Sequence, residues 1–360
     1  MKSRTMLRSV AGPLFALLAI AAQSSVWGQT FTTFDPPGSI ATAPGSINAA
    51  GQITGSYRDS SENTHVFVRD NDGTITSFDV PGVSFYEAIG ITQQGVVVGL
   101  YVDDAFNSHI FERAKDGTIT NLEFPSPGAF VYAVVFNTAG EIGGGFIDSS
   151  GKVNGFVRAP SGKFTLFPVP PALIPSFFLP NITALMQDGT IVGSFIDASF
   201  ASHGYLLSPD GNFTTFDPPN ALPSFFGGPS SVNNSGTITG FFSDGSQNGN
   251  FRVFLRAPNG VFSSFDTPQL GNQPIAAAIN PSGAVAGSVL NLVCTSVSCT
   301  TTWESFLRSA KGTVKPVNNP QAVPGTQPEQ GTGVLGINPS GEMFGIYFDA
   351  QGMQHGFVAK

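Results

Sequence analysis

From Phe31 to the C-terminus, apolar and polar residues alternate in short runs, and glycine or proline separates one run from the next. His65-Val66-Phe67-Val68-Arg69 and Thr76-Ser77-Phe78-Asp79 are two such runs. Alternation with a period of two, bounded by turn residues, predicts β-strands, and no segment shows a sustained helical period. The pattern therefore predicts an all-β chain.

The runs recur as a unit, and its most regular member is one aromatic residue. Successive copies lie 44 to 52 residues apart. The copies are Phe67, Phe111, Phe156, Tyr205, Phe254, Phe306 and Phe357. A strand-rich repeat of this length is typical of a β-propeller blade.

Each unit predicts four short strands. In the first unit, strand one ends at Asn48, and two glycines follow, Gly51 in the turn and Gly55 inside strand two. A turn glycine permits positive φ, and a glycine within a strand lets a neighbouring backbone approach closely. A proline ends strand four of every unit, since it cannot donate to a ladder. These prolines are Pro37, Pro81, Pro125, Pro170, Pro219, Pro268 and Pro320.

The two ends of the repeat region complement each other. The region begins with a strand four, residues 31–35, and ends with a strand three, residues 355–359. It lacks the polar capping repeats that an open stack needs. We expect one domain, residues 29–360: a seven-bladed β-propeller of four-stranded antiparallel blades, closed by the N-terminal strand. Its repeats start near residues 31, 76, 120, 165, 214, 263 and 315. An open β-solenoid and a six- or eight-bladed ring are the alternatives.

Residues 1–28 predict a signal peptide. Lys2, Arg4 and Arg8 precede an apolar segment, residues 14–22, that is too short to span a bilayer, and Gly28 offers a small residue before the cleavage site. An uncleaved membrane anchor is the alternative. We expect an exported bacterial protein, secreted to the extracellular space or held in the periplasm, with no membrane insertion of the mature chain.

Charge argues against several partners. Charged residues make up 11% of the chain, against about 25% in ordinary domains, and the net charge is −8. This balance provides no positive surface for nucleic acid or an anionic membrane. The remaining partners are an extracellular glycan or protein, and we expect a monomer.

The only two cysteines are Cys294 and Cys299. In an oxidising compartment a close, isolated pair favours a disulfide over a metal site, because two ligands without a nearby histidine do not complete a metal's coordination.

All four histidines follow an aspartate by six residues, as in Asp59/His65, Asp103/His109, Asp197/His203 and Asp349/His355. A carboxylate bonded to an imidazole can orient a general base. A catalytic site is needed once, however, so four copies favour a structural cross-strand bond. Nucleophile-elbow, zinc-protease and complete calcium-loop motifs are absent. We therefore predict no catalytic, cofactor-binding or metal-binding residues, and no cofactor.

One group of residues departs from the repeat. Aromatic residues cluster in the loops that lead from strand four to the next blade, on the same face as the loops between strands two and three. There they can stack on a sugar or clamp a peptide, or they can fill gaps between blades. The candidates are Phe85, Tyr86, Phe130, Tyr132, Phe177, Phe178, Phe225 and Phe226. We expect a ligand at this top-face mouth, with the insertion at residues 290–303 as a side wall.

The repeat resembles the probable extracellular repeat family HAF, named for a His-Ala-Phe signature. The matching positions are His65-Val66-Phe67, His109-Ile110-Phe111, His203-Gly204-Tyr205 and His355-Gly356-Phe357, and three units depart with Asn154, Arg252 and Glu304. The resemblance covers the whole mature chain. It implies an exported repeat protein without an assigned activity, and so bears on fold and location only.

Two functional classes remain. The first is an exported, non-enzymatic binding or structural module with a glycan or peptide ligand. The alternative is a propeller hydrolase or lyase acting on extracellular polysaccharide, with Asp103, Asp104 and Asp244 converging on the mouth. Two carboxyl groups about 5–10 Å apart in a top-face cleft would favour the enzyme. Aspartates that are each bonded within their own hairpin would oppose it.

Overall fold

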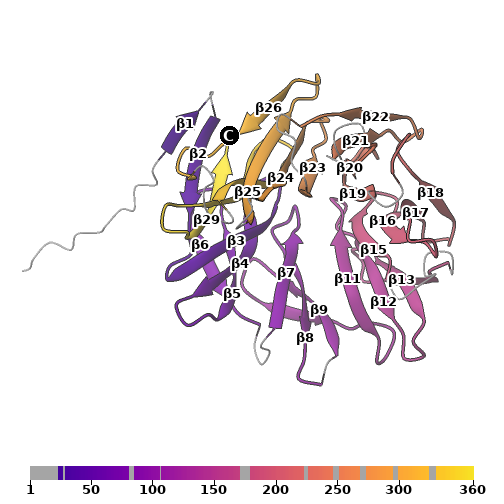
Figure 1. Ribbon diagram of the computed structural model, residues 1–360. Helices are drawn as coiled ribbons and strands as arrows, with labels where there is room; N and C mark the ends of the chain where they lie inside the picture. Colours follow the sequence, from indigo (N-terminus) through magenta and orange to yellow (C-terminus); the bar gives the residue numbers. More distant parts are fainter. Residues whose placement is uncertain are drawn as a thin grey trace, which may run out of the picture.

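The computed structural model describes residues 23–26, 29–80, 85–105, 107–170, 179–222, 226–245, 251–267, 273–294, 299–323 and 330–360. Every regular element in these residues is a β-strand (Figure 1). The all-β prediction is therefore confirmed. Within the same residues, no helix is long and apolar enough to span a membrane.

The first complete unit forms four consecutive antiparallel strands: β3 (Ser39–Ile47), β4 (Ile53–Asp59), β5 (Thr64–Arg69) and β6 (Ile75–Phe78). Hairpins join them, so the turns after β3 and β5 lie at one end of the sheet and the turn after β4 lies at the other. We call the first end the Asn-turn face, because Asn48 begins the turn after β3. The opposite end is the clamp face, named for the Asp–His contacts described below.

Four separate sheets repeat this order. The second contains β7 (Phe85–Ile91), β8 (Val97–Val102), β9 (Ser108–Arg113) and β10 (Ile119–Leu122). The third contains β11 (Phe130–Phe136), β12 (Ile142–Ile147), β13 (Val153–Arg158) and β14 (Phe164–Pro168). The fourth contains β15 (Asn181–Leu185), β16 (Ile191–Ile196), β17 (Ser202–Leu207) and β18 (Phe213–Phe216), and the fifth contains β19 (Phe226–Val232), β20 (Ile238–Phe242), β21 (Arg252–Arg256) and β22 (Phe262–Phe265).

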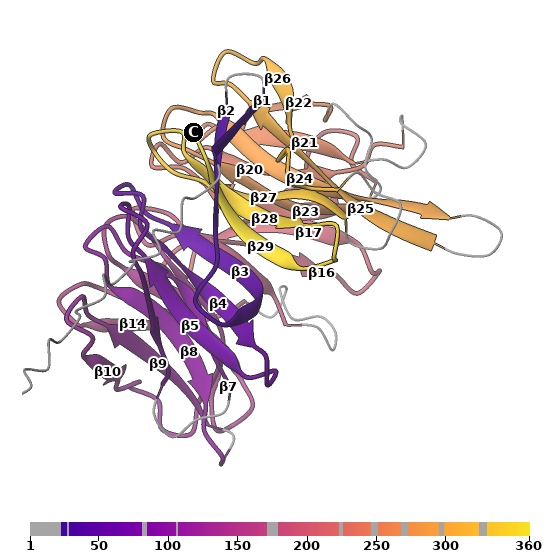
Figure 2. The same ribbon diagram turned by 90° about the vertical axis from the view of Figure 1, so that its left-hand side faces the viewer.

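The remaining strands join β3–β6 in a thirteen-stranded sheet. One group is β23 (Gln273–Ile279), β24 (Val285–Cys294), β25 (Cys299–Arg308) and β26 (Val314–Val317), and the other is β27 (Gln330–Ile337), β28 (Met343–Phe348), β29 (Gln354–Ala359) and β2 (Gln29–Phe34). Two short parallel contacts, β25 with β27 and β29 with β3, link these groups. The long β24–β25 hairpin projects from the molecule (Figure 2).

The N-terminal strand pairs with the C-terminal strand. In the antiparallel register of β2 and β29, Phe31 lies opposite Ala359 and Phe34 opposite Gly356. This is the pairing that the repeat predicts for residues 31–35. The short strand β1 (Gln23–Val26), within the predicted signal peptide, pairs with the other edge of β2. Removing β1 therefore leaves the β2–β29 pairing in place.

The first strand of each group faces the centre of the molecule (Figure 1). Each of these strands contacts the next in chain order, and the last contacts the first. The cycle consists of β3, β7, β11, β15, β19, β23 and β27. The walls around the molecular axis are therefore built from the strands that begin each unit.

The recurring aromatic residue is the centre of the core. All seven copies are at most 1% exposed, Phe156 among them at 0%. The strand-two glycine makes room for the ring and for the neighbouring backbone. A Cβ on Gly193 would lie 2.0 Å from the carbonyl oxygen of Asn181 and 2.7 Å from the ring of Tyr205. The predicted close approach at this glycine is confirmed.

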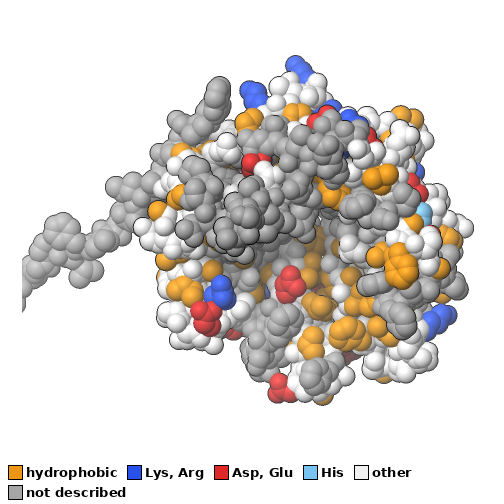
Figure 3. Space-filling view, in the orientation of Figure 1, with side chains coloured by type: hydrophobic (Ala, Val, Ile, Leu, Met, Phe, Trp, Pro, Cys, Tyr) orange, Lys and Arg blue, Asp and Glu red, His pale blue; other side chains and the backbone are white. Residues whose placement is uncertain are grey.

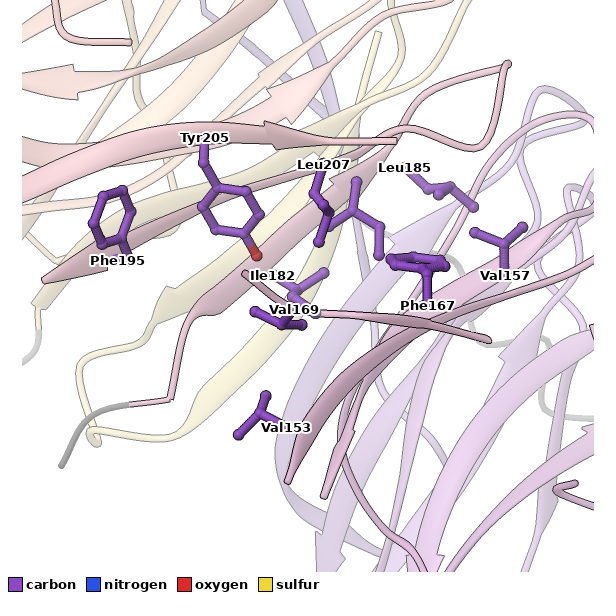
Figure 4. Packing of buried hydrophobic residues seen from close by; sticks show 10 residues of the cluster. Val153, Val157, Phe167, Val169, Ile182, Leu185, Phe195, Tyr205 and Leu207 are labelled. Atoms are coloured by element: carbon purple, nitrogen blue, oxygen red, sulfur yellow. The ribbon is translucent and has the colours of Figure 1, made fainter. Parts of the chain in front are cut away.

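Apolar clusters join each sheet to the next. In one cluster, Val153, Val157 and Phe167 of the β11–β14 sheet pack against Leu185 and Tyr205 of the β15–β18 sheet (Figure 4). Such burial contributes roughly 25 cal/mol per Å² of apolar surface removed from water. The sheets are therefore held face to face by the residues that alternate inward along their strands.

Candidate functional site

The Asp–His pairs lie across the hairpins on the clamp face. The Nε2 atom of His65 is 3.3 Å from Asp59, and the corresponding distance for His109 and Asp103 is 3.0 Å. The other oxygen of Asp59 accepts the backbone N–H groups of Ser61 and Asn63. The hydrogen bond from the Asn63 side chain, followed by that from its backbone, lowers the pKa of Asp59 to about 2. The predicted contact of aspartate with histidine across the hairpin is confirmed in all four pairs.

A second carboxylate completes three of these pairs, and we call each Asp–His–Asp set a clamp. The Nδ1 atom of His65 lies 2.7 Å from Asp79, that of His203 lies 2.9 Å from Asp217, and that of His355 lies 2.7 Å from Asp35. The hydrogen bonds to Asp79 and Asp35 raise the pKa values of His65 and His355. The spacing of 14 residues within a unit was a usable signal for the second aspartate, and the sequence reasoning missed it.

The residue at the histidine position differs in other sheets. Asn154 donates to Asp148 over 3.0 Å, and Arg252 contacts Asp244 at 3.1 Å and Asp266 at 2.7 Å. Histidine, asparagine and arginine share the ability to donate a hydrogen bond to a carboxylate, and they differ in acid–base chemistry. The position therefore supplies a hydrogen-bond donor to the hairpin aspartate in each of these sheets.

Of the three aspartates in the enzymatic alternative, two are bonded within their own hairpins and one is exposed. Asp103 is bonded to His109 within its own hairpin, and Asp244 is bonded to Arg252. Asp104 lies exposed in the turn between β8 and β9. In the described part of the chain, no group of three or more His, Cys, Asp or Glu side chains is placed to hold a metal ion.

Asparagines link neighbouring sheets on the Asn-turn face. The Oδ1 atom of Asn48 accepts the N–H groups of Ala50 and Gln52 in its own turn, while its Nδ2 donates to the Thr92 carbonyl over 2.9 Å. Equivalent donations run from Asn137 to Met186, Asn233 to Asn280, Asn280 to Asn338, and Asn338 to Asn48. The last of these joins the end of the repeat region to its beginning.

Two substitutions interrupt this chain of amides. Thr92 and Met186 occupy the asparagine position and carry no amide to donate to the next sheet. The Thr92 hydroxyl still accepts the Val96 N–H, and Asp188 accepts the Thr190 N–H in the Met186 turn. Both turns therefore form, and only the bond to the following sheet is lost.

A cavity of about 470 Å³ lies along the first strands β3, β7, β11, β15 and β19 and reaches their turns on the Asn-turn face. The described residues that line it include no Lys, Arg, His, Asp or Glu. Amides of Gln93, Gln187 and Asn234 project around it, with hydroxyls of Ser46 and Thr183. The Gln187 amide makes no hydrogen bond to another described residue. The cavity is therefore polar and uncharged.

The rest of the lining is apolar. Phe136 and aliphatic residues of the first strands contribute, and Phe136 packs so closely on Gly90 that a Cβ there would lie 2.2 Å from its ring. Thr138 bridges to Asn234 over 3.2 Å, joining the turns of the third and fifth sheets. Amide and hydroxyl groups beside aliphatic and aromatic surface suit a neutral polyhydroxylated or amide-containing ligand.

The predicted aromatic residues lie toward the other mouth. Phe85 and Tyr86 begin β7, Phe130 begins β11 and Phe226 begins β19, at the ends of these strands away from the Asn turns. Residues 177, 178 and 225, and the side chains of 85, 86 and 226, lie outside the described part. Phe130 is 43% exposed. Figure 3 shows hydrophobic side chains around a hollow near the middle of one face.

Tyr132 lies deeper than Phe130. Its ring covers Gly145, where an added Cβ would lie 2.3 Å from it, and packs against the cluster that joins the third and fourth sheets. Burial raises the pKa of its hydroxyl. Among described residues the hydroxyl has no hydrogen-bond partner.

The sequence reasoning missed Phe200, which is 70% exposed in the turn between β16 and β17. Its φ is +64°, and glycines with positive φ, Gly151 and Gly352, occupy the equivalent turns. A bulky side chain is strained in this conformation. Glu62, with a φ of +66°, occupies the same turn position in the first unit, so glycine stands there only in some units. A bulky aromatic residue three positions after the hairpin aspartate was the available signal.

The cysteines lie at the tip of the projecting hairpin. The register of β24 and β25 sets Cys294 directly opposite Cys299. Their side chains lie outside the described part, so the disulfide stays a prediction.

Comparison with known proteins bears on the fold. No protein-family model and no curated protein matches the sequence. A streptogramin B lyase structure superposes with a TM-score of 0.58 at 13% identity, covering 94% of this chain and 100% of that one. Virginiamycin B lyase from Staphylococcus aureus gives 0.57 at 15% identity, with 92% and 99% covered. The BP39L lectin from Burkholderia pseudomallei gives 0.53 at 12% identity, with 89% and 96% covered. The chain therefore has a fold of β-propeller type.

Proposed function

We propose that this chain is an exported, non-enzymatic binding protein built as a closed seven-bladed β-propeller. The closed cycle of first-strand contacts, the β2–β29 pairing and the bond from Asn338 to Asn48 support this number of blades and this closure. The signal-like segment at residues 1–28 supports export. The predicted disulfide between Cys294 and Cys299 suits the same compartment.

The ligand in this proposal is a neutral glycan, and the observation that carries it is the uncharged cavity of about 470 Å³. Sugar hydroxyls both donate and accept hydrogen bonds, as amides and hydroxyls of a protein do. Gln187 offers a free amide for this purpose, and Phe136 offers apolar surface for the hydrophobic face of a pyranose ring. The superposed BP39L is by its title a lectin, which agrees with this ligand class.

The aromatic mouth on the clamp face is the second part of the proposal. Phe130 is exposed there, and the backbone positions of Phe85, Tyr86 and Phe226 lie at the same ends of their strands. Phe200 is exposed on the same face, in the turn between β16 and β17. Rings at this mouth would stack on sugars that continue out of the channel. A peptide clamped by the same rings is the competing ligand.

The enzymatic alternative remains a hydrolase or lyase acting on polysaccharide. It is favoured by two of the superposed structures, which are lyases. It is opposed by the bonds of Asp103 and Asp244 within their own blades, because a carboxylate committed to turn geometry is not free to act as acid or base.

A glycan and peptide array probed with residues 29–360 tests the proposal. Hits are then measured by calorimetry in Gln187→Ala and in Gln351→Ala, whose side chain is exposed in the turn between β28 and β29. We expect neutral oligosaccharides to bind, Gln187→Ala to weaken binding about 5- to 10-fold, as for one lost hydrogen bond, and Gln351→Ala to bind as the parent does. Array hits that are cleaved rather than retained, or binding unaffected by Gln187→Ala, would contradict it.

A further inference from the structure

A second hollow adjoins the central cavity where the chain of amides is interrupted at Met186. Its volume is about 360 Å³, and it lies on the Asn-turn face between the β15–β18 and β19–β22 sheets. It shares Gln187, Asn233 and Asn234 with the central cavity. The two spaces therefore lie side by side, and we call the outer one the Met186 groove.

Arg256, at the end of β21, lines the Met186 groove. It is the last residue of the third strand of its unit. Other units have Arg69, Arg113, Arg158 and Arg308 at the same position. Each of those four donates a hydrogen bond, Arg158 to the Glu112 carboxylate and the others to a backbone carbonyl. Of these five described arginines, Arg256 is the one whose guanidinium donates to no other described residue.

The turn that follows β21 supplies no carboxylate to Arg256. Burial lowers the pKa values of Arg69 and Arg113, and nearby carboxylates partly offset this effect. They are Glu342 and Asp72 for Arg69, and Asp116 for Arg113. Burial lowers the pKa of Arg256 as well, and no carboxylate offsets it. The sequence explains the difference, because Asn259 stands in the equivalent turn. A guanidinium nevertheless keeps its charge at neutral pH.

The ring of Phe216 holds the guanidinium in place. The Arg256 carbon Cζ lies 5.0 Å from the centre of this ring, in the preceding sheet. The Nε atom is buried without a partner, as it also is in Arg69, Arg113 and Arg308. A stacked guanidinium presents its edge, where the N–H groups lie, and a carboxylate accepts two such N–H groups side by side.

The other groups of the groove favour a ligand rich in hydroxyls. Asp188 lines it too, with Oδ1 accepting the Thr190 N–H, and the Gln187 amide is free. A carboxylate such as Asp188 only accepts hydrogen bonds, so it needs donors from the ligand. A sugar acid supplies several hydroxyl donors beside its carboxylate. A peptide C-terminus supplies a carboxylate and a single amide donor nearby.

We propose that the Met186 groove binds a single uronate residue of an otherwise neutral glycan, with its carboxylate on Arg256 and its hydroxyls on Asp188 and Gln187. The proposal rests on the proposed glycan-binding function, because the neighbouring sugars of the same chain occupy the central cavity. A protein of net charge −8 repels acidic polymers at long range. One arginine therefore selects a sparsely acidic glycan rather than a dense polyanion.

Calorimetry with tetramers that each carry one glucuronate, galacturonate, mannuronate or guluronate residue among neutral sugars tests this proposal, with the methyl ester of each as its neutral counterpart. The variants are Arg256→Gln and, as a matched control, Arg308→Gln, since Arg308 also lies 5.0 Å from a phenylalanine ring, that of Phe265. We expect at least one tetramer to bind the parent tenfold or more tightly than its ester. Arg256→Gln should lose this preference, and Arg308→Gln should keep it.

The outcomes separate this proposal from the one it rests on. If the esters or neutral oligosaccharides bind and no tetramer shows an acid preference, the groove assignment is wrong and the glycan-binding function stands. If no oligosaccharide binds, with or without acid groups, both are wrong. If Arg256→Gln and Arg308→Gln lose the preference for acid over ester equally, Arg256 has a structural role only. Tight binding of a peptide with a free C-terminal carboxylate, without any tetramer binding, would replace the uronate.

Discussion

The pairing of β2 with β29 leads to a quantitative prediction about ring closure. A chain that begins at Pro36 lacks β2, and a chain that begins at Gln29 retains it while lacking β1. Phe31 is fully buried and Phe34 is 7% exposed. Burying one phenylalanine contributes roughly 1.5–3 kcal/mol, so the two together contribute about 3–6 kcal/mol. The shorter chain also loses the contact of Asp35 with His355.

A loss of about 3–6 kcal/mol is a large share of the roughly 5–15 kcal/mol by which domains are stable. We expect the chain that begins at Gln29 to unfold at a urea concentration close to that of the full chain. The chain that begins at Pro36 should unfold at a much lower concentration or fail to fold. The strand β29 would then present an unpaired edge, which favours aggregation.

Tryptophan fluorescence follows this transition well, because a chain that begins at Gln29 contains one tryptophan, Trp303. Its ring packs on Gly333 of β27, where an added Cβ would lie 2.7 Å away, within the group of strands that β2 completes. Equal unfolding midpoints for the two shortened chains would refute the reasoning, since β2 would then add nothing to the stability of the last blade.

Three further predictions concern the core and the clamps. Phe156→Ala should lower the free energy of unfolding by about 3–5 kcal/mol, measured by urea denaturation, because Phe156 is fully buried; a cost below about 1 kcal/mol would contradict its place in the core. His203→Asn should leave the unfolding midpoint nearly unchanged, because Asn154 stands at the same position of the third sheet and donates a hydrogen bond to Asp148. Loss of a specific activity with the fold intact would instead revive a catalytic role for His203. The hydrogen bond to Asp35 raises the pKa of His355 above its ordinary value of 6.5, so its stabilisation is complete below pH 6.5 and is lost as the pH rises through the raised value. Unfolding midpoints between about pH 5.5 and 8.5 should therefore fall with rising pH, and less steeply in His355→Asn than in the parent; identical slopes would show that this clamp does not titrate.

The pattern along the chain was enough to predict the strands and the core. Alternation around Phe156 places this ring on the inner side of β13, and the glycine of the preceding strand makes room for it. The Asp59/His65 contact was predictable because six residues span one hairpin. These features depend on neighbours within one repeat, so local sequence contains the information.

Contacts between repeats could not be predicted from the sequence. The amide of Asn48 binds a carbonyl 44 residues away, and that of Asn338 binds one 290 residues away. The sequence shows asparagine at these positions, and the turn role of its oxygen explains that choice. The donation by its nitrogen exists only once the sheets are set side by side. For the same reason, only the structure shows that Thr92 and Met186 each leave out a hydrogen bond to the following sheet.

The candidate site is a product of tertiary structure. Gln187, Asn234 and Arg256 come from different turns and strands, and nothing in their spacing marks them as neighbours. The sequence by itself determined which residues are strands, which rings are buried and which turns each aspartate orders. The arrangement of sheets around a common axis decided which polar groups surround one cavity, because that arrangement brings together residues whose distance along the chain exceeds a whole repeat.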